Sequence, residues 1–385
     1  MTPPPQVLSC FAIVTPGLEA FAIAEAEALG LQPMAEPGGF AWQGTAESAL
    51  MANVGLRIAS RVLVRLSSFE ARSFAELERH ARKIDWARVI GPGESVRFRV
   101  TCKKSKLYHS DAVAQRVADA VKRALPGVRA EGASVGEDET DDVPEDAALI
   151  VVRVMRDRCT VSADSSGSLL HRRGYRLAST KAPLRETIAA GMLAAAGWDT
   201  ASPLVDPLCG SGTIAIEAAL LARGIPPGGQ RSFAMERWPT VRAGLGESVR
   251  DFLKSRRTGI AQATIVASDR DNGAIAAARE NATRAGVRDD IGFGVHSLSA
   301  ATFPDSVSGW VVTNPPYGVR VGEADRVRDL WAQLGNVLRD RASGWRVAVL
   351  SPDSALDRQL RFPLRQVASL SNGGIPVRIM VGDIP

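Results

Sequence analysis

The apolar positions of this chain recur with two different periods, and each period predicts a type of element. Residues 6–14 are almost continuously apolar and predict a buried strand, and the next apolar positions recur at helical spacing up to Gly30. Over residues 96–101 apolar and polar side chains alternate instead, which predicts a strand with one buried face. Ser110 is placed to cap a helix that ends before Pro126.

The first part of the chain therefore mixes strands and helices. Residues 149–154 and 159–163 predict a strand pair around a basic turn. Such a mixture predicts a small α+β module whose exposed strand end and helix start are both basic.

The second part of the chain alternates strands with helices, which predicts an α/β fold with a doubly wound, Rossmann-like sheet. A helix is predicted over residues 186–196, with Gly197 as its end. The predicted strands that follow end at Asp206, Asp269, Val295 and Val312.

Length and composition limit the class of protein. At 385 residues the chain predicts two or three domains, and 45% hydrophobic with 23% charged residues is typical of a globular protein. No window approaches the roughly 18–20 apolar residues of a membrane span. The start lacks the basic region of a signal peptide, so we expect a cytoplasmic protein. Four scattered cysteines and four scattered histidines indicate neither a disulfide framework nor a metal site.

The net charge of +5 is unevenly distributed. Residues 1–170 carry 20 basic and 22 acidic residues, a net of −2, whereas residues 171–385 carry 27 and 20, a net of +7. Seven carboxylates lie within residues 137–146, which predict a solvated loop. Outside that loop both parts are positive, which is compatible with a polyanionic partner without requiring one.

A glycine loop follows the strand that ends at Asp206. Gly210 and Gly212 allow close backbone approach, and the next helix presents free N–H groups. The spacing also fits the relaxed dinucleotide fingerprint. Asp206 separates the two interpretations, because a carboxylate repels a pyrophosphate but can bind the amino group of an amino-acid cofactor. We favour S-adenosylmethionine over a nicotinamide nucleotide.

Asp269 ends the next strand and can accept hydrogen bonds from ribose hydroxyls. In a compact unit such an acid lies ~20 residues past the glycine loop. Here Asp269 follows Asp206 by 63 residues, and the additional residues, roughly 223–259, are predicted to be an insertion. With its positive charge and Trp238, the insertion is either an RNA contact or a cover for the sheet. Asn281 is expected to pack at the end of the helix that follows.

The sequence Asn314-Pro315-Pro316-Tyr317 follows an apolar strand. Alone it is compatible with a proline-rich turn. It also places an amide oxygen, an outward carbonyl and an aromatic ring together, which suits a flat amine with two N–H donors. Carbon methylation of a pyrimidine would need a cysteine nucleophile, and Cys209 lies in the glycine loop instead.

Two further segments carry a resemblance to a known family. Residues 98–113, with Lys103-Lys104-Ser105-Lys106-Leu107-Tyr108-His109, resemble the THUMP domain of RNA-modifying enzymes, although Lys-Lys-x-Lys alone could be a solvated turn. Residues 169–176 and 182–187 resemble the segment that joins THUMP to the catalytic domain in guanine-N2 RNA methyltransferases. The whole chain resembles the N-terminal half of the bacterial fused enzyme that forms N2-methylguanine in large-subunit ribosomal RNA, and its stand-alone relatives.

The resemblance implies a domain order and a set of site residues. The expected domains are a ferredoxin-like region (1–50), a THUMP domain (51–165), a linker (166–180) and a class I methyltransferase domain (181–385). The catalytic candidates are Asn314, Pro315, Pro316 and Tyr317. The cofactor candidates are Pro183, Thr187, Asp206, Pro207, Gly210, Ser211, Gly212, Thr213, Asp269, Arg270, Ser297 and Asn314. The RNA-binding candidates are Lys103, Lys104, Lys106, Tyr108, His109, Arg172, Arg173 and Arg176.

Ser297 departs from the family pattern, because methyltransferases usually place an adenine-binding acid there. The expected function is S-adenosylmethionine-dependent methylation of a guanine N2 amine in ribosomal RNA. The alternatives are a tRNA or protein glutamine target, and a non-catalytic RNA-binding assembly factor.

Overall fold

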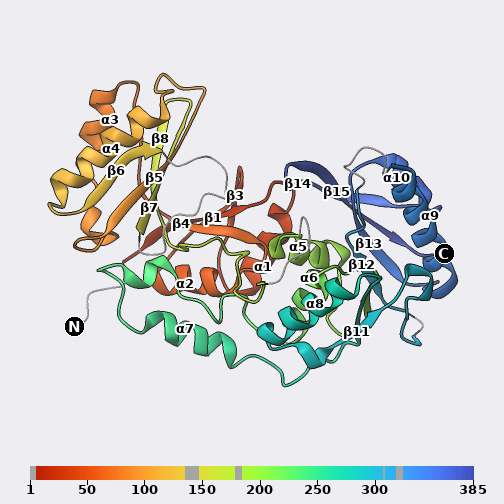
Figure 1. Cartoon of the computed structure of the whole chain (residues 1–385). Coiled ribbons are helices and arrows are strands. Elements are labelled where there is room, and N and C mark those ends of the chain that lie inside the picture. Colours follow the sequence, from red (N-terminus) through yellow and green to blue (C-terminus); the bar gives the residue numbers. More distant parts are fainter. Residues whose placement is uncertain (1–5, 135–146, 178–183, 307, 318–323) are drawn as a thin grey trace. The chain divides into compact units, whose positions relative to one another are not determined.

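The structure is a computed structural model that describes residues 6–134, 147–177, 184–306, 308–317 and 324–385. It divides into two compact units, which we describe separately (Figure 1). The N-terminal unit comprises residues 1–13, 26–170 and 231–252, and the C-terminal unit comprises residues 14–25, 171–230 and 253–385. The acidic residues 137–146 predicted as a loop lie outside the described residues.

The N-terminal unit is built on one sheet, with the strand order β2-β3-β1-β4-β8-β7-β5-β6 among the described residues. Helix α4 packs on β5 and β6, and α3 packs on α4. The strands are β1 (Leu8–Val14), β2 (Met34–Glu36), β3 (Gly39–Gly44), β4 (Ala59–Glu70), β5 (Ser95–Lys103), β6 (Arg129–Ser134), β7 (Ala147–Met155) and β8 (Arg158–Asp164). The helices are α1 (Glu19–Ala28), whose residues 19–25 are assigned to the C-terminal unit, α2 (Ala46–Gly55), α3 (Phe74–Ala81), α4 (Ser110–Ala124) and α7 (Leu245–Lys254).

The predicted α+β mixture is confirmed, with one local correction. Ser110 is the first residue of α4 rather than its cap, and the capping position is occupied by His109, whose side chain makes no capping hydrogen bond. The strand pair β7–β8 turns at Arg156 and Asp157, both with positive φ.

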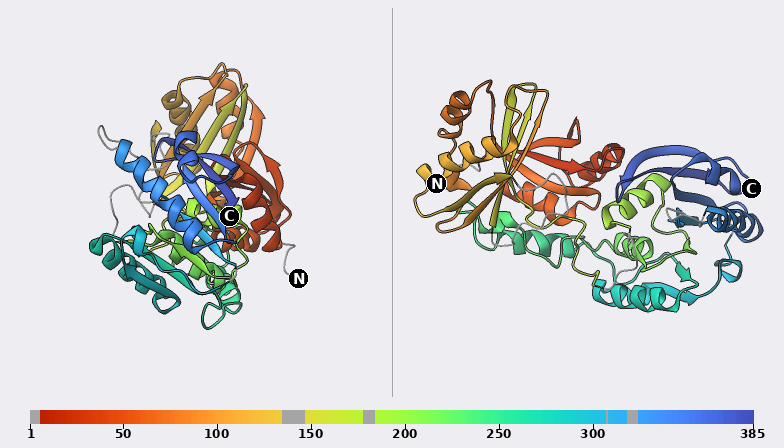
Figure 2. Two further views of the ribbon diagram at one scale, coloured as in Figure 1. Left: turned by 90° about the vertical axis from the view of Figure 1, so that its right-hand side faces the viewer. Right: turned by 45° about the horizontal axis from the view of Figure 1, so that its top comes forward.

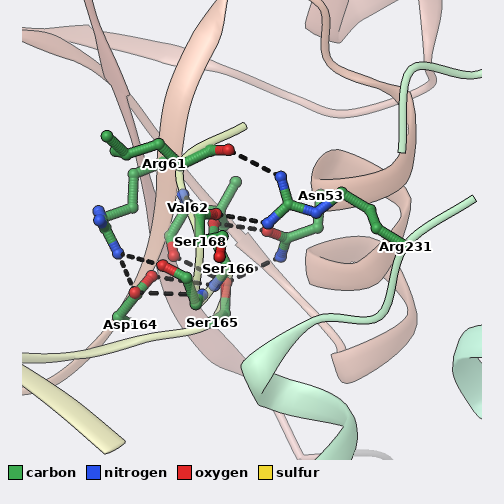
Figure 3. A network of polar contacts seen from close by, with 10 residues as sticks. Asn53, Arg61, Val62, Asp164, Ser165, Ser166, Ser168 and Arg231 are labelled. Atoms are coloured by element: carbon green, nitrogen blue, oxygen red, sulfur yellow. Dashed lines mark hydrogen bonds and ion pairs between the residues drawn. The ribbon is translucent and has the colours of Figure 1, made fainter. Parts of the chain in front are cut away.

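Residues 231–252 belong to the N-terminal unit although they follow the cofactor loop in sequence. Arg231 donates to the carbonyl oxygens of Ser168 (2.5 Å) and Leu169 (2.7 Å), beside the buried pair of Arg61 and Asp164 (Figure 3). Trp238 is only 6% exposed. The insertion is therefore anchored to this unit, and its tryptophan is a core residue rather than an RNA contact.

The C-terminal unit is a mixed sheet with the order β11-β10-β9-β12-β13-β15-β14 among the described residues. The strands are β9 (Leu204–Asp206), β10 (Ile265–Asp269), β11 (Ile291–Val295), β12 (Trp310–Thr313), β13 (Arg346–Ser351), β14 (Arg365–Asn372) and β15 (Ile375–Asp383). The helices are α5 (Glu186–Ala196), α6 (Thr213–Ala222), α8 (Asn272–Ala285), α9 (Ala324–Arg341) and α10 (Ser354–Gln359). Among the described residues, short 3-10 helices complete both units: η1 (Trp86–Arg88), η2 (Ala234–Arg237), η3 (Arg288–Asp290) and η4 (Leu298–Ala300).

The doubly wound arrangement of this sheet is confirmed by its two packed faces. Helices α5, α6 and α8 pack side by side, whereas α9 places Trp331 and Leu334 in a core with Val311 and Val347 of the strands. The helices of this unit can be followed in Figures 1 and 2. As predicted, α5 ends at Gly197, which is left-handed, whereas α8 continues past Asn281 to a left-handed Gly286.

Candidate active site

Three parallel strands bring the predicted chemical groups to one edge of the sheet. Strand β9 lies between β10 and β12, with Val205 opposite both Val266 and Val311. Because parallel strands end on the same edge, Asp206, Asp269 and Asn314 lie together there. The doubly wound sheet predicted from the sequence implies this neighbourhood, because such a sheet brings the carboxyl ends of its strands to one rim.

The glycine loop has little room for larger residues. Gly212 is left-handed (φ +84°), and a Cβ added there would lie 2.9 Å from Cβ of Ala278. The backbone N–H of Gly210 donates to Oδ2 of Asp269 (3.0 Å), and Asn281 donates to the Ser211 carbonyl (3.2 Å). The loop therefore packs tightly between α6 and α8 and presents its backbone at the sheet edge.

Asp206 is buried, being only 1% exposed. The Thr313 hydroxyl donates to its Oδ1 (2.7 Å), as does the Leu208 amide (3.3 Å). Burial raises the pKa of Asp206 to about 7, because desolvation outweighs these two neutral donors and nearby Asp269 adds repulsion. A buried carboxylate with neutral donors, beside a backbone-lined loop, fits a cofactor with a cationic amino group.

The target side of the edge is a hydrogen-bonded unit. The Tyr317 hydroxyl donates to Oδ1 of Asn314 (2.5 Å), and Nδ2 of Asn372 donates to the Tyr317 oxygen (3.2 Å). The Pro316 carbonyl accepts a hydrogen bond from the Trp331 indole (3.2 Å). The hydrogen bond from Thr313 to Asp206 joins the target side of the site to the cofactor side. Asn314 directly follows Thr313 in sequence.

The other cofactor candidates have varied surroundings. Pro207, Thr187 and Thr213 are buried, and the Thr213 hydroxyl accepts a hydrogen bond from Arg176 (2.8 Å). Arg270 is exposed. Ser297 is exposed and lies 3.0 Å from the Ser299 hydroxyl, Oγ to Oγ. Pro183 lies outside the described residues. Their cofactor contacts stay predictions.

The two groups of RNA-binding candidates lie in different environments. Lys103, Lys104, Lys106, Tyr108 and His109 are all exposed, and the two rings are adjacent, with centroids 4.0 Å apart.

In the second group only Arg172 is exposed. Arg173 is buried and pairs with Glu217 (2.8 Å), and Arg176 pairs with Glu186 (3.1 Å). The guanidinium groups of Arg173 and Arg176 are thus engaged with interior carboxylates, and we do not include them in the proposed RNA surface.

Thr313, Trp331 and Asn372 were not singled out from the sequence as site residues. Thr313 looks like an ordinary strand residue, and its only signal is its place directly before Asn314. Asn372-Gly373 is one of the segments that carry the family resemblance, but the sequence alone assigns Asn372 no role at the site. Their contribution depends on contacts between distant segments.

The thiol next to the site is poorly suited to nucleophilic attack. Cys209 is buried, and its pKa lies well above the usual range because of desolvation and the nearby carboxylates of Asp206 and Asp269. In the described part of the chain, no three metal-binding side chains are grouped to hold an ion. None of its helices is long and apolar enough to cross a membrane.

Comparison with known families matches nearly the whole chain. Residues 9–63 match the RlmL ferredoxin-like domain, residues 71–164 match the THUMP domain, and residues 173–378 match the RMKL-like methyltransferase domain. The last match alone spans more than half of the chain. The exact limits of the domains stay predictions.

Individual relatives agree with this assignment. The chain is 34% identical to the protein named "Putative RNA methyltransferase slr0064" of Synechocystis sp., over 96% of this chain and 95% of that one. It is also 34% identical to "Ribosomal RNA large subunit methyltransferase K/L" of Syntrophotalea carbinolica, over 97% of this chain but 53% of that protein. The chain thus spans about half the length of the K/L relatives.

A solved structure supports the same fold. The structure described as "SMU.472, a putative methyltransferase complexed with SAH" superposes with a TM-score of 0.84 at 27% identity, covering 99% of both chains. From the matches to its three domains and the near full-length relative, the chain belongs to the THUMP-containing RNA methyltransferases of the RlmK/L family.

Proposed function

We propose that this protein methylates the exocyclic N2 amine of a guanine in large-subunit ribosomal RNA, with S-adenosylmethionine as the donor. The observation that carries the proposal is the hydrogen bond between Thr313 and Asp206. Asn314, the proposed acceptor for the amine, follows Thr313 in sequence and so supports a target site next to the carboxylate expected to bind the donor.

The donor assignment rests on the residues at the ends of β9 and β10. Asp269 presents its carboxylate beside the Gly210 amide, where ribose hydroxyls could be bound. The cationic end of the donor would favour the ionised form of Asp206, whose pKa of about 7 leaves it partly protonated in its absence. The SAH complex of the 27%-identical relative supports this choice.

The acceptor residues would prepare the amine. The guanine amine is a poor nucleophile because its lone pair is delocalised into the ring. Hydrogen bonds from its two N–H groups to Oδ1 of Asn314 and to the Pro315 carbonyl would favour a tetrahedral nitrogen. The bound donor supplies an electrophilic methyl group on a sulfonium sulfur. Held beside Asp206 and Asp269, the donor would give this methyl group to the amine lone pair and leave as the neutral thioether with the S–C electron pair. The methylated amine would then lose one proton to water.

The choice of ribosomal RNA rests on the K/L relatives and on the exposed basic run of the THUMP domain. Lys103, Lys104 and Lys106 could bind phosphates, and the rings of Tyr108 and His109 could stack on unpaired bases.

The test is to restore a deletion strain with wild-type protein, Asn314→Ala, or Asn336→Ala as an exposed asparagine control on α9. Mass spectrometry of digested 23S rRNA and of tRNA measures N2-methylguanine. We expect wild type and Asn336→Ala to restore the 23S modification, and Asn314→Ala to lower kcat by about 10²- to 10³-fold. Unchanged modification by Asn314→Ala would contradict the mechanism, and a loss confined to tRNA would reassign the substrate.

A further inference from the structure

A β-hairpin far along the chain contributes a side chain to the candidate active site. Strands β14 and β15 are joined by Gly373 and Gly374, both with positive φ (+59° and +83°), which favours a tight two-residue turn. Asn372 is the last residue before that turn. Its Nδ2 lies 3.2 Å from the Tyr317 hydroxyl oxygen.

The direction of the hydrogen bonds follows from the number of protons available. A phenol has one proton to donate, and the Asn372 amide nitrogen can only donate. Tyr317 therefore accepts from Asn372 and gives its own proton to Oδ1 of Asn314, 2.5 Å away. Burial raises the pKa of Tyr317, so this proton is retained at neutral pH.

These contacts determine which face of the Asn314 amide is available. An amide oxygen has two acceptor sites, and the amide group can otherwise rotate so that its nitrogen takes the oxygen's place. With one acceptor site of Oδ1 occupied by Tyr317, the oxygen cannot exchange with the nitrogen without losing that bond. The second acceptor site remains for a substrate amine.

We infer that Asn372 is a positioning residue, which acts through the Tyr317 hydroxyl to hold Oδ1 of Asn314 toward the substrate amine. The inference deepens the proposed function and rests on it. We call the two hydrogen bonds from Asn372 to Tyr317 and from Tyr317 to Asn314 the relay. The relay gives Tyr317 a second role besides stacking on the base, because stacking needs only the ring whereas the relay needs the hydroxyl.

Three substitutions separate the two roles. Tyr317→Phe keeps the ring and removes both hydrogen bonds of the hydroxyl. Asn372→Ala removes only the hydrogen bond that Asn372 donates to Tyr317. Asn372→Asp replaces the donor by an acceptor, which should draw the Tyr317 proton away from Asn314. Ser371→Ala is the matched control, because Ser371 is the exposed neighbour on the same strand.

The kinetic result expected is a fall in kcat with little change in S-adenosylmethionine affinity. One net hydrogen bond corresponds to about five- to tenfold in rate, so Asn372→Ala should lower kcat by about that factor, and Tyr317→Phe by at least as much. The double variant should be no slower than Tyr317→Phe alone, because both changes interrupt one relay. Additive losses, or an unchanged kcat in Asn372→Ala, would overturn the inference.

A readout without catalysis distinguishes this inference from the proposed function. The chain has three tyrosines, so protein labelled with 3-fluorotyrosine should give three ¹⁹F resonances, with that of Tyr317 assigned by its loss in Tyr317→Phe. Asn372→Ala and Asn372→Asp should move the Tyr317 resonance, and Ser371→Ala should leave it in place. A resonance unmoved by either Asn372 variant would refute the relay even if methylation is found. A shifted resonance in a protein that methylates no guanine would support the relay and contradict the proposed function.

Discussion

Two basic runs of this chain have similar sequences but lie in opposite environments. In the run at residues 102–110, which starts in β5 and reaches α4, the three lysines are exposed, and Tyr108 is 69% exposed. In the run at residues 171–176, Arg173 and Tyr175 are 4% and 3% exposed. Both runs were predicted to contact RNA, and the structure gives the second a largely interior role.

The second run is buried because a buried carboxylate, that of Glu217, binds two of its side chains. Glu217 lies on α6 among buried apolar residues and is fully buried. Its Oε1 accepts hydrogen bonds from Arg173 (2.8 Å) and from the Tyr175 hydroxyl (3.0 Å). A buried carboxylate without a cation would be strongly destabilising, and Arg173 supplies that cation. A basic residue with an acid on a nearby apolar helix is thus better interpreted as a structural ion pair.

The largest effect expected from this comparison is on stability. Arg173→Met should destabilise the C-terminal unit by about 3–5 kcal/mol, because it leaves the Glu217 charge buried and unpaired. Guanidinium unfolding followed by tryptophan fluorescence measures the change. Adding Glu217→Gln should recover part of the loss, since it removes the uncompensated charge.

Arg172→Met is the control for that experiment. The side chain is exposed and adjacent in sequence, so its stability change should stay within about 0.5 kcal/mol. If Arg173→Met were as mild as Arg172→Met, the structural role of the second run would be wrong.

A second, smaller effect should appear with pH. Burial and the charges of Arg185, Arg172, Arg173 and Arg176 lower the pKa of His171 to about 3. Because the unfolded chain binds a proton near pH 6.5 and the folded chain does not, this residue costs stability as pH falls below 6.5. Between pH 7 and pH 5 the loss should reach about 2 kcal/mol.

The measurement compares unfolding midpoints of wild type and His171→Gln at both pH values. Buried acids with raised pKa, such as Asp206, change stability in the opposite direction over part of this range, and they do so in both proteins. The difference between the two proteins isolates His171. Equal pH dependence in both would show that His171 is solvated.

Much of the fold could be predicted because local patterns and tertiary packing agree. The alternation in β5, the Gly197 end of α5 and the ends of β9, β10 and β11 follow from periodicity and glycine positions. The return of residues 231–252 to the N-terminal unit could not be predicted, because it depends on the contacts of Arg231 with a segment some 60 residues earlier.

The candidate site divides in the same way. Asp206 and Asn314 follow predicted strands, and Gly212 lies in a glycine loop that the sequence identifies. Their position at one edge of a doubly wound sheet could therefore be expected. The link between Asp206 and Thr313 spans 107 residues, and that between Tyr317 and Asn372 spans 55. Such pairs depend on strand order and hairpin length, which no local pattern encodes.

The smallest effect expected in the comparison concerns the first basic run. Replacing Lys103, Lys104 and Lys106 by glutamine should weaken RNA binding by roughly tenfold at physiological salt and leave stability almost unchanged. Each lost phosphate contact removes about 0.7 from the slope of log affinity against log salt for single strands, so the slope should become shallower by about 2.

Filter binding or fluorescence anisotropy with a ribosomal RNA fragment, at several salt concentrations, measures both quantities. The charge-matched control replaces Lys83, Lys122 and Arg123, which are also exposed on the N-terminal unit. If both triple variants flatten the salt dependence equally, the unit attracts RNA through its overall charge. If only the first does so, lysines beside the exposed rings of Tyr108 and His109 form a localised contact, because bound phosphates release counterions only where the strand lies.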